Sequence, residues 1–184
     1  MSYRFMEDAE LVRRCLQKDR RAEKALYDQF SGQMYAICFR YMKDAQEAQD
    51  VFQEGMIKVY NKLHTWKGVG PLGGWMRQIF IHCALNQIKT NQKHWSVNIE
   101  SIPPTENLDV SILSELHTEA ILDLIQKLPI GYRTVFNLFA IEGYSHAEIA
   151  TLLEVSESTS KTQFLKAKAK LKSLIETPLK LTTA

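Results

Sequence analysis

The sequence predicts an all-α protein of two small helical domains joined by a linker, with the C-terminal domain a helix-turn-helix. Apolar residues recur at helical spacing along almost all of the 184 residues, whereas the alternation typical of strands is nearly absent. A polar stretch that contains Pro103 and Pro104 interrupts this periodicity, and we interpret residues 96–111 as the linker. The domains are therefore expected at residues 1–95 and 112–178.

The net charge of +2 is divided unevenly along the chain. Residues 1–95 carry 15 Lys and Arg against 10 Asp and Glu, residues 96–123 carry none against 6, and residues 124–184 carry 8 against 5. Two basic blocks separated by an acidic segment indicate two modules that face nucleic acid.

The first domain begins with two amphipathic stretches. Apolar residues at helical spacing run from Ala9 to Leu16 and again from Ala22 to Met42, up to a break near Lys43. Asp44 and Glu47 then form a capping-box pattern, which predicts the start of a long helix.

A glycine-rich stretch, KGVGPLGGW, follows that helix from Lys67 to Trp75 and holds four of the eight glycines. It predicts a loop that either has unusual backbone conformations or lies close to another molecule. A third strongly amphipathic helix is expected from Trp75 to Ile88, with Trp75 at the head of its apolar stripe.

The charges of the first domain are polarised. From Asp44 to Gly55 there are four acids and no bases, and from Met56 to Ile99 there are six bases and no acids. Acids at a helix N-terminus complement the helix dipole, which is the purely structural interpretation. That interpretation does not cover the basic residues that follow, so the change of sign indicates two different partners on adjoining surfaces.

The second domain is expected to hold a helix over 112–128, another that starts at Pro129, and the motif from Gly143 to Leu171. Ser145 and Glu148 form a capping box at the start of the first motif helix. Glu154 and Val155 lie in a tight turn, after which Ser156 caps the second helix.

The second helix of the motif is basic: Ser158 to Ile175 contains five lysines and no acids. A basic, hydroxyl-rich second helix is typical of a helix-turn-helix that lies in a DNA major groove. The alternative is a helical hairpin with a solvated lysine face.

Other classes of protein are disfavoured. The N-terminus MSYRFMEDAE lacks the apolar core of a signal peptide, and no apolar run reaches the ~18 residues of a membrane span. Cys15, Cys38 and Cys83 are expected to be buried free thiols, as in a reducing cytoplasm. The five histidines form no ligand cluster, so we expect no metal and no cofactor. No phosphate-binding loop or acid cluster among the basic residues indicates an enzyme such as a nuclease.

From about Ala22 to Ile175, the chain resembles an extracytoplasmic-function sigma factor, a small two-domain bacterial transcription initiation factor. In the first domain the resemblance rests on DAQEAQDVFQEGMIKVYNKLHTWKG followed by GGWMRQIFIHCALNQIK. In the second domain it rests on LPIGYRTVFNLFAIEGYSHAEIATLLEVSESTSKTQFLKAKAKL. It implies core RNA polymerase and promoter DNA as partners, an anti-sigma factor as a further partner, and a protein without catalytic residues.

The resemblance also implies three sets of site residues. In the family an acidic helix docks on the polymerase, which here assigns Asp44, Glu47, Asp50, Gln53 and Glu54. The segment from Lys62 to Gly74 and the helix from Trp75 are similar to the part that captures a melted minus-ten base, with candidates His64, Trp66, Arg77, Gln78, His82 and Lys89. The helix after Ser156 is similar to the part that reads the minus-thirty-five element, with candidates Thr159, Lys161, Thr162, Gln163, Lys166 and Lys168.

The chemistry of these residue types agrees with the assignment. Aromatic, basic and amide side chains suit unpaired bases and their phosphates, and short hydroxyls, amides and lysines at a helix N-terminus suit a duplex. Several positions depart from the family pattern: Glu154 stands at the usual glycine of the turn, Ser160 at a usual valine, and Gln163 at a usual arginine. The alternative function is that of an autonomous helix-turn-helix transcriptional regulator.

Overall fold

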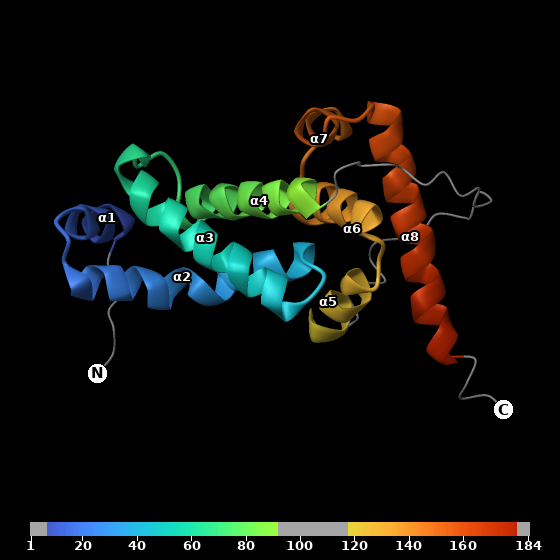
Figure 1. The fold of residues 1–184 in the computed structure, drawn as a ribbon, viewed down its shortest axis with the longest axis horizontal. Helices are drawn as coiled ribbons and strands as arrows, with labels where there is room; N and C mark the ends of the chain where they lie inside the picture. Colours follow the sequence, from blue (N-terminus) through green and yellow to red (C-terminus); the bar gives the residue numbers. More distant parts are fainter. Residues whose placement is uncertain (1–6, 92–117, 180–184) are drawn as a thin grey trace. The chain divides into compact units, whose positions relative to one another are not determined.

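The computed structural model describes residues 7–91 and 118–179, and all regular structure within these two ranges is helical. The chain divides into two compact units, Met1–Asn91 and Gln92–Ala184, whose helices are drawn in Figure 1. The all-α, two-domain prediction is confirmed. The predicted linker at 96–111 lies outside the described residues. Among the described helices, none is long and apolar enough to cross a membrane.

The first unit contains four helices and one short 3-10 turn. They are α1 (Asp8–Leu16), α2 (Arg20–Tyr41), α3 (Ala45–Lys62), η1 (Leu63–Thr65) and α4 (Leu72–Asn91). Helices α2, α3 and α4 pack against one another, and α1 packs on α2 and η1. The side chain of Asp19 caps α2 and that of Asp44 caps α3, so both long helices begin where an oxygen accepts an orphan backbone N–H.

The closest approach in this unit joins α3 to α4. A Cβ atom on Gly55 would lie 2.4 Å from Cε1 of Phe80. Phe80 is fully buried and stacks on Phe52, with the ring centroids 5.8 Å apart. The glycine in the middle of α3 therefore serves packing, because it lets an aromatic ring of α4 lie against the α3 backbone.

Helix α4 begins three residues earlier than predicted. The backbone N–H of Leu72 donates to Asp8 Oδ2 on α1 at 2.7 Å, so a side chain from another helix caps α4. A Cβ on Gly73 would lie 3.1 Å from Cε1 of Phe30. Two glycines of the predicted loop therefore lie in a helix that packs closely on α2. Trp75, expected in the core, is half-buried, whereas Leu72 and Met76 are fully buried.

Within residues 118–179, the second unit contains four helices and one π-helical segment. They are α5 (Thr118–Gln126), α6 (Ile130–Phe136), η3 (Asn137–Ile141), α7 (His146–Leu153) and α8 (Glu157–Leu179). Helix α8 packs on α5, α6 and α7. Ala167 and Leu171 of α8 are buried in the core of this unit, where they pack with Ile125, Leu128 and Phe136.

The helix-turn-helix consists of α7, a turn, and α8. Ser145 and Glu148 form the predicted reciprocal capping box. The Ser156 hydroxyl accepts the Thr159 backbone N–H at 3.0 Å, which confirms the predicted cap of α8. Glu154 ends α7 in the left-handed region, with φ 58° and ψ 42°. The turn therefore keeps the geometry that favours glycine while holding a glutamate.

All three cysteines are buried and free, as predicted. Burial raises the pKa of Cys15 to about 11 and that of Cys38 to about 12. Burial also raises the pKa of Cys83. These thiols therefore remain protonated at neutral pH and act as small core side chains.

Two glycine-to-alanine substitutions should have opposite effects on the free energy of unfolding. Gly55→Ala should lower it by about 1–3 kcal/mol, because the new methyl group overlaps the buried Phe80 ring. Gly32→Ala, in the middle of α2, meets nothing within 4 Å and should raise it by about 0.5–1 kcal/mol through helix propensity. Urea denaturation followed by circular dichroism measures both. Equal effects would show that Gly55 does not determine the α3–α4 packing.

Candidate nucleic-acid and partner interfaces

The acidic residues of α3 lie on its outward side. Asp50, Gln53 and Glu54 are exposed, whereas Asp44, which caps the helix start, and Glu47 are half-buried. Asp44 Oδ1 accepts the Glu47 N–H at 2.9 Å, and Glu47 accepts the Lys43 N–H at 3.3 Å. The predicted capping box is thus only half-formed, because Glu47 bonds outside the helix start.

Part of this acidic charge is already paired within the domain. Glu54 forms an ion pair with Lys58 one turn later, and Glu47 lies 3.9 Å from the Lys43 ammonium. Asp50 accepts a hydrogen bond from the Gln46 side-chain amide at 3.3 Å. Exposed pairs of this kind are weak, so a basic partner surface can displace them.

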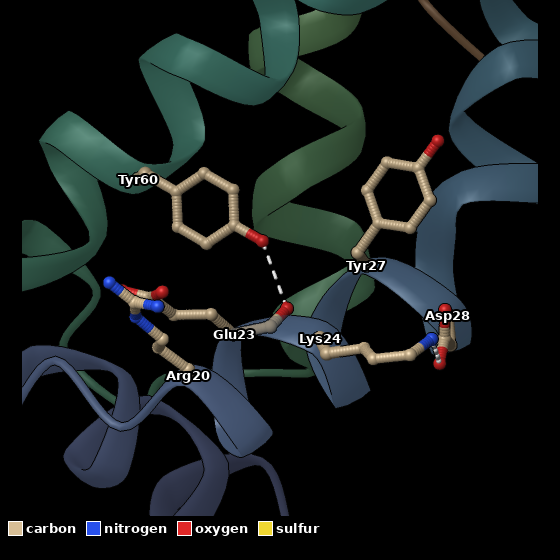
Figure 2. A pocket seen from close by; sticks show the side chains of 6 residues that line it. All are labelled: Arg20, Glu23, Lys24, Tyr27, Asp28 and Tyr60. Carbon is tan, nitrogen blue, oxygen red and sulfur yellow. Dashed lines mark hydrogen bonds and ion pairs between the residues drawn. The ribbon is translucent and has the colours of Figure 1, made fainter.

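A groove of about 620 Å³ runs between α2 and α3. Figure 2 shows Tyr60 projecting from α3 toward five side chains of α2. The Tyr60 hydroxyl donates to the Glu23 carbonyl oxygen at 2.9 Å, and Lys24 pairs with Asp28 at 2.6 Å. Burial, together with nearby acidic groups, raises the pKa of Tyr60 to about 12. The remaining lining residues are Arg20 and Tyr27.

Helical geometry places Gln53 and Ile57 on the same side of α3 as Tyr60, the α3 residue that lines the groove. At 100° per residue, Gln53 and Tyr60 lie about 20° apart around the α3 axis. Ile57 lies about 60° from Tyr60 and Asp50 about 80° from it. Ile57 is 60% exposed, so a large apolar side chain stands between the acids and the groove.

The predicted minus-ten residues divide between η1, the loop and α4. His64 is exposed on η1 and Trp66 is half-buried just after it. The Trp66 indole Nε1 is shielded from solvent, and no described residue accepts a hydrogen bond from it. Val69 at the loop tip is 86% exposed between Gly68 and Gly70, both with positive φ. The loop therefore presents an apolar tip held by two glycine-specific backbone conformations.

On α4, three of the four predicted side chains lie on one side. Gln78, His82 and Lys89 are exposed and, from their spacing, lie within about 40° of one another around the helix axis. Arg77 is half-buried and about 100° from Gln78, so it faces a different direction.

On α8, Lys161 and Thr162 are exposed, and Thr159, Lys166 and Lys168 are half-buried. Lys161 pairs with Glu157 at 2.7 Å, which lowers the pKa of that glutamate. The Lys168 ammonium lies 5.6 Å from the Phe164 ring centroid.

Gln163, which was predicted to contact the minus-thirty-five element, is buried in the structure. Its side chain is only 5% exposed, and its Oε1 would lie 3.1 Å from a Cβ placed on Gly131 of α6. In this conformation Gln163 therefore faces α6, whereas the sequence-based prediction placed it at the DNA-facing surface. The spacing of Ala167 and Leu171 on the same side of α8, at intervals of four, could have indicated this.

Leu165 is a surface residue that sequence reasoning missed. It is 57% exposed and continues the outward stripe of Ser158, Lys161 and Thr162 at positions i+7, i+4 and i+3. A leucine on the polar side of a lysine-rich helix was the available signal. An apolar side chain at this position suits a thymine methyl group in a major groove.

Two family models match the chain. The sigma-70 region 2 model matches residues 26–94, and the sigma-70, region 4 model matches residues 118–171. The RNA polymerase sigma-H factor of Pseudomonas aeruginosa is 26% identical over 174 residues, covering 88% of this chain and 90% of that protein. The ECF RNA polymerase sigma factor SigX of Bacillus subtilis is 29% identical over 149 residues, covering 74% and 75%.

A solved structure supports the fold. The sigma factor RpoE of Bartonella quintana, in complex with the anti-sigma factor NepR, aligns with a TM-score of 0.51 at 19% identity, covering 83% of this chain and 96% of that one. Two helical domains that match regions 2 and 4 are the architecture of a sigma factor. The chain belongs to the sigma-70 family, in its extracytoplasmic-function class. Its function is promoter recognition in transcription initiation.

Replacing Glu154 by glycine should stabilise the second domain by about 1 kcal/mol. A residue other than glycine is strained in the left-handed conformation that Glu154 adopts. A higher midpoint for unfolding of the second domain in urea, with little change in the first, would confirm this. An unchanged or lower midpoint would mean that contacts of the Glu154 side chain offset the backbone strain.

Proposed function

We propose that the chain docks on core RNA polymerase through α3, captures the melted minus-ten strand with the loop and α4, and reads the minus-thirty-five duplex with α8. The observation that carries the proposal is the opposite charge of adjoining surfaces in the first domain. The outward side of α3 is acidic, whereas the residues from Lys58 to Lys89 are basic. An acidic surface repels DNA and attracts a basic protein surface.

The polymerase-docking surface comprises Asp44, Glu47, Asp50, Gln53 and Glu54. Its apolar part is Ile57, which is 60% exposed and lies about 20° from Asp50 and about 60° from Glu54 around the α3 axis. The Tyr27–Tyr60 groove lies further along α3. Charged residues around a small apolar centre are the usual composition of a protein interface.

The melted strand meets His64, Trp66 and the loop first, then Gln78, His82 and Lys89 along α4. Rings suit stacking on unpaired bases, while lysine and amide groups suit phosphates and base edges. The exposed Val69 adds an apolar tip at the point where strands separate. We assign Arg77 to the same strand as a separate contact, from a side of α4 about 140° away from His82 around the helix axis.

The duplex contacts are made by the outward stripe of α8. Lys161, Lys166 and Lys168 neutralise phosphates, and Thr162 and Leu165 reach base edges. Thr159 lies at the helix start, where its hydroxyl lies 2.8 Å from that of Ser156, so it positions the helix as well as facing DNA.

The chain itself carries no catalytic residues in this proposal, because the polymerase performs the chemistry, and it needs no metal or cofactor. It acts in the cytoplasm, where the polymerase and promoter are. An anti-sigma factor is a further partner, as for the Bartonella quintana relative.

The acidic and apolar parts of the docking surface should differ in their salt dependence. Asp50→Ala with Glu54→Ala should weaken polymerase binding at least tenfold at low salt, and less at high salt because exposed charges are screened. Ile57→Ala should weaken binding about fivefold at either salt concentration, because apolar contacts are not screened.

Leu16→Ala is the matched control, since Leu16 is a 50% exposed leucine on α1 that is not assigned to this surface. Titration of labelled chain with core polymerase measures each affinity, and circular dichroism verifies the fold. If neither α3 variant lost affinity, the docking surface would lie elsewhere and the chain would act as an autonomous regulator.

Promoter selection should depend on Leu165 and Thr162 and not on Gln163. Leu165→Ala should relax preference at one minus-thirty-five position, at a cost of about 1–3 kcal/mol for the favoured base. Gln163→Ala should change stability while leaving the preferred sequence unchanged, because Gln163 is buried.

A library randomised at the minus-thirty-five element, selected with reconstituted polymerase, measures both effects. Lys172→Ala, further along α8, serves as the control and should weaken binding evenly across sequences. A new sequence preference for Gln163→Ala would mean that α8 rotates when it binds DNA.

A further inference from the structure

A hydrogen bond joins the two helices of the helix-turn-helix. Nδ1 of His146, the first residue of α7, lies 2.9 Å from the Ser160 hydroxyl oxygen on α8. Ser160 is fully buried, and a buried hydroxyl is costly unless it is hydrogen-bonded. His146 is thus the described side chain that satisfies Ser160.

The His146 ring is also held by aromatic contacts from two other elements. It stacks on Phe139 of η3, with centroids 4.2 Å apart and planes 13° apart. It meets Phe164 of α8 edge-on at 5.9 Å, and Phe139 and Phe164 lie 4.6 Å apart. One imidazole therefore joins η3, α7 and α8.

The position of this contact on α8 makes it relevant to DNA reading. Ser160 lies between Thr159 and Lys161 and one turn before Phe164, on the side of α8 opposite the outward stripe. A shift of Ser160 relative to α7 would move Lys161 and Thr162 with it. Binding groups need support of this kind from a second layer of hydrogen bonds and packing.

We propose that neutral His146 is a positioning residue that fixes the recognition helix α8 against α7, so that protonation of His146 loosens the reading of the minus-thirty-five element. This inference rests on the proposed role of α8 in duplex recognition.

The surroundings of His146 oppose a positive charge on its ring. The ring is partly buried and lies at the N-terminus of α7, where the helix dipole disfavours a cation. The charged groups that act on it are Lys161, which disfavours the imidazolium, and Glu157, which favours it but already pairs with Lys161. Burial, followed by Lys161, lowers the pKa of His146 below its ordinary 6.5.

The direction of the pH dependence follows from this. Because the folded chain holds His146 neutral more strongly than the unfolded chain does, protons bind preferentially to the unfolded state. The contribution of His146 to the free energy of unfolding is therefore complete above the ordinary histidine pKa. That contribution is lost as the pH falls through and below this pKa. Duplex recognition should weaken only where His146 protonates in the folded chain, which happens below pH 6.5 because its pKa is lowered there.

Polymerase reconstituted with the full chain, and DNA selected from the randomised minus-thirty-five library, provide the test. At about pH 7.5, His146→Phe should weaken affinity about fivefold, because it keeps the ring contacts but leaves the Ser160 hydroxyl unpaired. Adding Ser160→Ala should restore most of that affinity, since no buried hydroxyl then remains. Thr151→Ala, which removes an exposed hydroxyl on α7 that bonds Ala147, is the control and should change nothing.

The pH dependence of DNA affinity distinguishes a role of His146 in positioning α8 from a role in core packing alone. Affinity of the wild-type chain should fall by several-fold between about pH 7.5 and pH 5.5, relative to a fragment without a minus-thirty-five element. The His146→Phe, Ser160→Ala chain should lose this extra pH dependence. The same pH dependence in both chains, or no rescue by Ser160→Ala, would overturn the proposal.

Hydrogen exchange of the free full chain distinguishes this result from a failure of the proposed function. The amides of the first two turns of α8 should exchange faster in His146→Phe and in the wild-type chain at acidic pH, once intrinsic rates are corrected. If the wild-type chain showed no minus-thirty-five preference, the proposed function of α8 would be contradicted, but the role of His146 in positioning α8 would not. Unchanged exchange would contradict the role of His146 whatever α8 binds.

Discussion

The close contact between α3 and α4 at Gly55 is the constraint on which the first domain depends. With no side chain at Gly55, the Phe80 ring lies against the α3 backbone and stacks on Phe52. This packing buries one side of α3 and leaves its acidic residues facing outward. The connection from η1 to α4 is short, and Gly68 and Gly70 adopt positive φ within it. The two surfaces of opposite charge are therefore held on one rigid unit, as a protein that must bind both polymerase and DNA requires.

The sequence was sufficient to predict the helices, the caps and the two-domain architecture, because these depend on local periodicity and on residues three or four positions apart. Ser145 with Glu148 and Ser156 with Thr159 are contacts of this kind. It was not sufficient where a partner distant in sequence decides the outcome. Asp8 caps α4 from 64 residues away, so the helix begins inside a stretch whose glycines predicted a loop. Trp75 heads an apolar stripe, but α4 turns Leu72 and Met76 into the core instead.

In the candidate site, too, local sequence predicted some features and contacts distant in sequence decided others. The residue types of α8 predicted a basic recognition helix, yet its rotation about its own axis is set by what it packs on. Ala167 and Leu171 join the core with Phe136, and this places Gln163 toward α6 and Leu165 toward solvent. Gln163 and Leu165 lie about 160° apart around the axis of α8, so burial of one side chain exposes the other. The spacing of Gln163, Ala167 and Leu171 at intervals of four indicates the buried side, and the tertiary contacts confirm it.

The buried side of the recognition helix is unusually polar for a small domain. Ser160 and Gln163 on α8, with Thr134 and Asn137 on α6 and η3, are all almost inaccessible to solvent. Apolar contacts tolerate small rotations, whereas hydrogen bonds between buried groups hold only over a narrow range of distance and angle. Of these groups, the Ser160 hydroxyl bonds a second helix, at His146 Nδ1 on α7, whereas Thr134 donates to Ile130 within α6. The Ser160–His146 bond therefore favours one orientation of α8 relative to α7. For the proposed role of α8, in which Thr162 and Leu165 lie against base edges, a defined orientation matters more than the last increment of stability. The same bond makes the orientation of α8 sensitive to the protonation of His146.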